Sequence, residues 1–131
     1  MSDSENHFEW EVIHSYTRNQ ALKDGTLIDV TEYARLHGFK IPVAITAGLW
    51  VYIGVSPELE SVGQSVAGRI NDVLTLLFME IRKAGADTDR IKYLVDFLVE
   101  PDRNETVEVY ALVGPDDDMK PCLTIGLSED F

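Results

Sequence analysis

The chain has 131 residues, of which 45% are hydrophobic, and its 23 acidic side chains against 11 Lys and Arg give a formal net charge of −12. These values fit one globular domain and exclude a disordered chain and a protein that binds nucleic acid through a basic surface. Because no run reaches about 18 apolar residues and the first residues are polar and acidic, we expect neither a membrane span nor a signal peptide.

The N-terminal part of the chain predicts a tail followed by a short helix. We expect residues 1–10 to form a flexible tail and residues 11–131 to form a single domain. Thr17 and Gln20 have the spacing of a capping box, so a helix should begin there. Gly25 supplies a stop after about two turns.

Two further short elements follow this helix. Residues 26–30, with Leu27, Ile28 and Val30, are expected to form a brief strand. Thr31 is expected to cap a second short helix over residues 32–37, which Gly38 should end.

The next segment predicts a strand that passes directly into a helix. Residues 42–45 are rich in residues that favour extended backbone, and Thr46 is a suitable N-cap for a helix over residues 47–53. Ser56-Pro57-Glu58 has the signature of another helix start.

One long helix is predicted over residues 64–84. Apolar residues recur every three or four positions, and further apolar residues between them make the helix apolar almost all round, so we expect it to be central. Gly85 should end it.

The last third changes to the alternation of β-strands. Three alternating runs separated by the turn clusters 101–104 and 114–118 predict a three-stranded antiparallel meander. The long helix should cover the apolar face of this meander, which gives an α+β fold. The predicted core comprises Leu27, Ile28, Trp50, Val66, Ile70, Val73, Leu77, Ile81, Tyr93, Val95, Phe97, Val109 and Ile125.

The pattern of reactive side chains predicts neither a metal site nor a cofactor site. The three histidines, His7, His14 and His37, are scattered without a second ligand at metal-binding spacing. Cys122 is the only cysteine, which excludes an intramolecular disulfide and favours a reduced, cytoplasmic protein. No nucleophile elbow or phosphate-binding glycine motif occurs, so we expect no cofactor.

An acidic run, Asp116-Asp117-Asp118, follows Gly114-Pro115. It could attract a hard cation, but it lacks the alternating acids and distal Glu of a calcium loop. We therefore expect a solvated hairpin turn at this position.

The densest polar cluster is His14-Ser15-Tyr16-Thr17-Arg18, followed by Asp24-Gly25 and Asp29. The stretch IHSYTRNQAL, with DG, LIDV and the later AR, GF, PVA and Thr46, resembles a family of small uncharacterised proteins encoded on bacterial plasmids, integrative elements and phages. The resemblance covers about residues 12–50. It implies a mobile-element context, and a helix that begins at Thr46 and carries Trp50.

A second resemblance is confined to the same opening. His14, Tyr16 and Thr17 before a short helix, then Asp24-Gly25, are similar to the start of ADP-ribosyltransferase folds, which implies an NAD site. The catalytic Glu of such enzymes has only Glu105 and Glu108 as counterparts here. The simpler interpretation is that His14 and Tyr16 bind the backbone of the turn while Thr17 caps the helix.

Acidity is concentrated in the last third, where residues 87–131 hold twelve acids and four bases. Such a surface keeps a protein soluble, and it can also steer basic partners or imitate a phosphate backbone. The leading hypothesis is a non-enzymatic accessory protein of a mobile element that binds a protein with a basic surface and inhibits a host nucleic-acid-binding or defence protein. The alternatives are a small NAD-binding ADP-ribosyltransferase-like enzyme and a purely structural protein. The residues expected to bind a ligand or partner are His14, Tyr16, Thr17, Arg18, Asp29, Asp116, Asp117 and Asp118.

Overall fold

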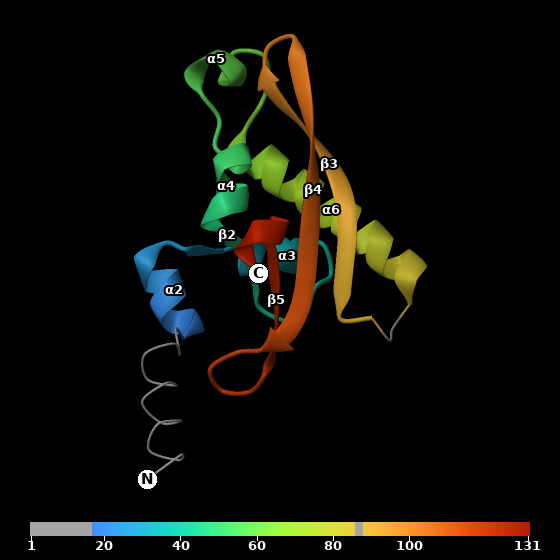
Figure 1. Cartoon of the computed structure of the whole chain (residues 1–131). Helices are drawn as coiled ribbons and strands as arrows, with labels where there is room; N and C mark the ends of the chain where they lie inside the picture. The colour runs from blue at the N-terminus through green and yellow to red at the C-terminus, as the bar shows by residue number, and fades with distance from the viewer. Residues whose placement is uncertain (1–16, 86–87) are drawn as a thin grey trace.

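The computed structural model describes residues 17–85 and 88–131 and shows an α+β fold built on one five-stranded sheet (Figure 1). Its strands are β1 (Leu27–Asp29), β2 (Val43–Thr46), β3 (Arg90–Glu100), β4 (Arg103–Pro115) and β5 (Pro121–Gly126). Its helices are α2 (Arg18–Asp24), α3 (Thr31–Leu36), α4 (Ala47–Ile53), α5 (Pro57–Glu60), α6 (Val66–Ala84) and the 3-10 turn η1 (Ser128–Asp130).

The predicted three-stranded meander is only part of the sheet. Strands β3, β4 and β5 are consecutive antiparallel neighbours, but β2 pairs parallel with β5 and β1 pairs antiparallel with β2. The strand order β1-β2-β5-β4-β3 therefore corrects the prediction. All four residues of β2 are buried, and β5 lies 75 residues or more further along the chain, so no turn signal links the two strands in the sequence.

Helix α6 lies across one face of the sheet (Figure 1). Ser65 caps its start by accepting a hydrogen bond from the Gly68 N–H, and Gly85, with φ of 87°, follows its last residue. The predicted bounds are thus confirmed within two residues. We expected this helix to be central, but it is not covered all round, because Phe78 is 37% and Met79 is 51% exposed.

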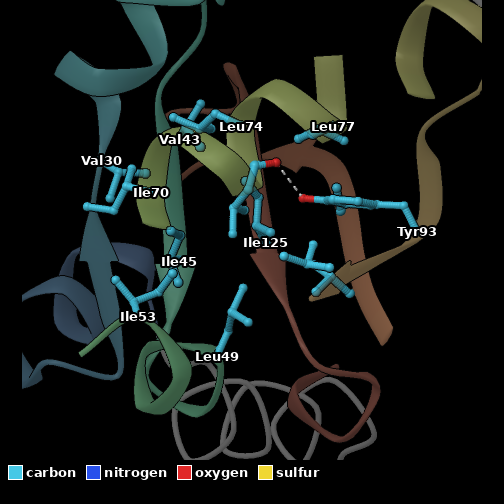
Figure 2. Close-up of a cluster of buried hydrophobic side chains, with 14 of the residues drawn as sticks. Val30, Val43, Ile45, Leu49, Ile53, Ile70, Leu74, Leu77, Tyr93 and Ile125 are labelled. Atoms are coloured by element: carbon cyan, nitrogen blue, oxygen red, sulfur yellow. Dashed lines mark hydrogen bonds between the residues drawn. The ribbon is translucent and has the colours of Figure 1, made fainter. Parts of the chain in front are cut away.

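The core fills the layer between α6 and the sheet (Figure 2). Buried side chains of α6 meet Ile45 of β2 and Ile125 of β5, and the hydroxyl of Tyr93 donates to the carbonyl oxygen of Val73 at 3.0 Å. This hydrogen bond lets a phenol sit among apolar side chains without an unsatisfied polar atom. It also ties β3 to the middle of α6.

Most of the predicted core is confirmed, with corrections at the N-terminal side. Leu27, Ile28, Trp50 and Ile81 are only partly buried, and Val66 is 37% exposed at the first turn of α6. The predicted residues that are fully buried are Ile70, Val73, Leu77, Tyr93, Val95, Phe97, Val109 and Ile125. Those the prediction missed include Val43, Ile45, Leu49, Ile53 and Leu74.

The short helices begin largely where the caps predict. Thr17 and Gln20 form the capping box, and Thr46 accepts a hydrogen bond from the Leu49 N–H. The prediction that Thr31 caps the second helix is wrong, because Thr31 is the first residue of α3. Instead, the carboxylate of Asp29 accepts from the Thr31 N–H at 3.0 Å, as Asp does readily two residues before a turn.

Replacement of Leu77 by Ala tests the packing of α6 on the sheet. Leu77 is fully buried, so Leu77→Ala should lower the free energy of unfolding by about 2–5 kcal/mol, measured by urea denaturation. Val66→Ala on the same helix is the matched control and should change stability by about 0.5 kcal/mol or less. Equal losses in the two variants would contradict the packing described.

Candidate functional site

The structure joins two predicted clusters that the sequence keeps apart. The Asp117 carboxylate accepts hydrogen bonds from the backbone N–H groups of Arg18 and Asn19, each at 2.9 Å. The turn between β4 and β5 is therefore docked onto the start of α2, 98 or more residues away in the chain. Thr17, Arg18 and Asp117 belong to one site, whereas His14 and Tyr16 lie outside the described residues.

Arg18 is fixed on the face of the sheet opposite α6. Its guanidinium donates to the Thr124 hydroxyl at 2.7 Å and to the Leu123 carbonyl oxygen at 3.0 Å. The backbone N–H of Arg18 is bound to Asp117 and its side chain is bound to β5, so this one residue anchors α2 to the sheet by two sets of hydrogen bonds.

The three aspartates of the acidic turn have different roles. Asp116 accepts from the backbone N–H groups of Lys120 at 2.9 Å and Asp118 at 2.8 Å. The hydrogen bond from Lys120 is the main cause that lowers the pKa of Asp116 below its ordinary value. Partial desolvation raises this pKa, and the hydrogen bond from Asp118 lowers it further. The hairpin turn is confirmed, but two of its carboxylates organise backbone, and only Asp118 projects without such a bond among the contacts described.

Asp29 lies in a separate shallow cleft of about 320 Å³ on the far side of α2. Its carboxylate accepts from both the N–H and the hydroxyl of Thr31. Arg18 lines this cleft as well.

A groove of about 690 Å³ opens beside Arg18, between α2, the end of the β4–β5 hairpin and η1. One wall is built by Asp130, whose carboxylate accepts from the Thr46 hydroxyl and from the Leu127 N–H, each at 2.7 Å. A Cβ at Gly48 would lie 2.5 Å from the Asp130 carboxylate, and a Cβ at Gly126 would lie 2.5 Å from Thr46. The sequence analysis did not predict this wall, and Gly48 and Gly126 were the only residues in the sequence that pointed to it.

The groove is lined by one thiol and by two carboxylates, those of Asp117 and Asp130. Its thiol, Cys122, is buried, and burial raises the pKa of Cys122, so the reactive thiolate is disfavoured. The carboxylates of Asp117 and Asp130 are engaged by backbone and hydroxyl donors. Within residues 17–85 and 88–131, no group of three or more His, Cys, Asp or Glu is placed to hold a metal ion.

A second functional feature is organised by Arg69, a guanidinium that is only 4% exposed. It donates to the carbonyl oxygens of Tyr52 at 2.6 Å and Leu98, and to the Gln64 side chain at 3.3 Å. Burial lowers the pKa of Arg69, with Asp72 raising it in part, but an arginine remains charged at neutral pH. Because its partners flank α5 on both sides and include Leu98 near the end of β3, Arg69 joins the α5 segment to the tip of the β3–β4 hairpin.

The segments that Arg69 joins carry a group of exposed carboxylates. Helix α5 contacts β3, and α5 and the tip of the β3–β4 hairpin lie at the same end in Figure 1. Arg103, the one exposed base that the described α5 and hairpin-tip residues contribute, is bound to Glu100 at 2.8 Å. We call the exposed carboxylates of this end the acidic pole: Glu58, Glu60, Glu100, Asp102 and Glu105.

Comparison with protein families gives one match. A model described as "Family of unknown function (DUF6573)" matches residues 4–131. Comparison with curated proteins and with solved structures gives no match. In the part of the chain that the structure describes, no helix is long and apolar enough to cross a membrane.

Asp117 offers a test of the docked turn. Asp117→Ala removes the acceptor of two N–H groups at the start of α2 and should lower the free energy of unfolding by about 1 kcal/mol, as loss of a helix cap does. Asp118→Ala, the matched control in the same turn, should change it by about 0.5 kcal/mol or less. An equal effect of both variants in urea denaturation would show that Asp117 does not hold the turn to α2.

Proposed function

The chain belongs to the DUF6573 family of unknown function, and from its surface we propose that it is a non-enzymatic binding protein that engages a basic protein surface through the acidic pole. The observation that carries this proposal is the gathering of five exposed carboxylates from two separate segments around a single, already paired arginine. Such a concentration of one sign of charge raises the rate of encounter with a surface of the opposite sign.

The acidic pole supports this role better than the acidic turn does. The carboxylates of Asp116 and Asp117 accept hydrogen bonds from the turn and from α2, so they are less available to a partner. The carboxylates of the pole project from a short helix and a hairpin that Arg69 holds together. Their arrangement is therefore fixed before a partner arrives, which lowers the entropic cost of binding.

A more specific proposal concerns the biological role of the chain and the kind of protein that it binds. The likeness of residues 12–50 to proteins of plasmids, integrative elements and phages supports an accessory role in a mobile element. A basic protein surface in a bacterial cell commonly serves nucleic acid, whose phosphates the fixed carboxylates would imitate. The proposed action is thus inhibition of a host nucleic-acid-binding or defence protein in the cytoplasm.

The alternative of an NAD-dependent enzyme has no described contact in its favour. His14 and Tyr16 lie outside the described residues, and Glu108 of β4 accepts a hydrogen bond from Tyr110 on the same exposed face. It stays a hypothesis, and the experiment below includes NAD as a separate arm.

Two variants with the same net charge test the proposal. The pole variant carries Glu58→Gln, Glu60→Gln, Asp102→Asn and Glu105→Gln, and the control carries Glu32→Gln, Asp89→Asn, Asp118→Asn and Glu129→Gln, all at exposed positions. Partners captured from a bacterial lysate by the wild-type chain are identified by mass spectrometry and purified. Their affinity should fall at least about tenfold with the pole variant and stay unchanged with the control.

Competition with duplex DNA distinguishes occupation of a nucleic-acid-binding surface from binding through charge alone. Duplex DNA should displace the wild-type chain from its purified partner if the acidic pole occupies a nucleic-acid-binding surface, and binding should weaken with salt because exposed charges are screened within about 8 Å at physiological ionic strength. Equal binding by the pole variant and the control would overturn the proposal. A rise in melting temperature with NAD would instead support the enzyme alternative.

A further inference from the structure

Strand β3 forms a long outer edge of the sheet. It has eleven residues and stands last in the strand order, with β4 as its only strand neighbour in the described part of the chain (Figure 1). The opposite edge, β1, has three residues. Natural proteins shorten, bend or cover such edges because unpaired backbone groups recruit another strand. In β3 the only irregularity is at its end, between Leu98 and Glu100.

The register identifies which backbone groups of β3 face outward. The Val113 N–H donates to the Asp89 carbonyl oxygen at 2.8 Å, so odd-numbered residues of β3 are directed towards β4. Even-numbered residues must then present their N–H and C=O groups to the outside. Leu98 confirms this parity, because its carbonyl oxygen accepts from Arg69 and not from β4.

The outward-facing residues of the middle of β3 have a self-complementary order. They are Lys92, Leu94 and Asp96, all exposed, with Leu94 61% exposed although it is a large apolar residue. If a second copy of β3 pairs antiparallel with Leu94 on the twofold axis, Leu94 faces its own counterpart. Lys92 of each copy then stands opposite Asp96 of the other. A shift of two residues in either direction would set Leu94 against a charged residue, so the pattern selects one register.

The flank of this edge carries exposed apolar residues among charged ones. A cleft of about 490 Å³ runs beside it, lined by Leu76, Met79 and Glu80 of α6 together with Leu94. Met79 is 51% exposed although it lies on the helix that covers the core. Exposed apolar residues that flank an unpaired strand edge are typical of a surface that is buried in an assembly.

We propose that the chain forms a twofold-symmetric homodimer by antiparallel pairing of β3 with β3 of a second copy, centred on Leu94. The pairing adds about six backbone hydrogen bonds across residues 92–96 and makes one continuous sheet of both copies. Leu98 marks the natural end of the ladder, because Arg69 already occupies its carbonyl oxygen. In this dimer the two acidic poles point to opposite ends, since each follows the C-terminal end of its own β3.

A charge-swap series tests the dimer with the full chain. Sedimentation equilibrium of the wild type should give twice the chain mass of 14.7 kDa at concentrations of about 10–100 µM, the range of a modest interface. Lys92→Asp places two aspartates opposite one another at two symmetric positions and should weaken dimerisation at least about tenfold. Asp96→Lys should do the same with two lysines.

The double variant Lys92→Asp/Asp96→Lys restores opposite charges in the same register, and it should recover the wild-type dimer. This recovery separates a lost interface from a lost fold, which no single variant can do. Lys40→Asp, at an exposed position away from β3, is the charge-matched control and should remain dimeric. A monomeric wild type, or a dimer that the single charge swaps leave unchanged, would overturn the proposal.

Discussion

A guanidinium buried at 4% exposure is the interaction on which the arrangement of this molecule most depends. Arg69 donates to carbonyl oxygens 15, 17 and 29 residues away, in Gly54, Tyr52 and Leu98, and its Cζ atom lies 5.9 Å from the centre of the Phe97 ring. Withdrawing a charge from water is costly unless its donors are satisfied, and here they are satisfied by the carbonyl oxygens of Tyr52 in α4, of Gly54 and of Leu98 in β3. The desolvation free energy of Arg69 is thus offset only if α4, the α5 segment and β3 are all in place together.

This constraint links the fold to both proposed surfaces. By fixing the α5 segment against the tip of the β3–β4 hairpin, Arg69 brings together carboxylates that are about 40 residues apart in the sequence. By occupying the outward carbonyl of Leu98, it also ends the part of β3 that is open to another strand. The part of the acidic pole that lies on the β3–β4 hairpin and the proposed dimer edge therefore adjoin along β3, with the contact of Arg69 at Leu98 between them.

Local signals in the sequence were sufficient for most elements but not for their assembly. Caps at Thr17, Thr46 and Ser65 and the stop at Gly85 predict where helices begin and end, because capping depends on residues within one turn. The pairing of β2 with β5 depends on burial of both faces of Val43–Thr46, which a local pattern cannot reveal. For the same reason the bonds from Arg18 and Asn19 to Asp117, nearly 100 residues apart, were invisible, and an acidic turn expected to be solvated holds a helix instead.

The most direct test of the central role of Arg69 is hydrogen exchange in the variant Arg69→Met, compared with Arg82→Met at an exposed position of the same helix. Loss of the guanidinium should speed amide exchange in both the α5 segment, residues 54–64, and the end of the β3–β4 hairpin, residues 98–105, because both lose their shared donor. Exchange in β1 and β2 should change much less. Unchanged exchange in either of the two segments, or the same pattern in Arg82→Met, would contradict the claim that Arg69 holds the acidic pole together.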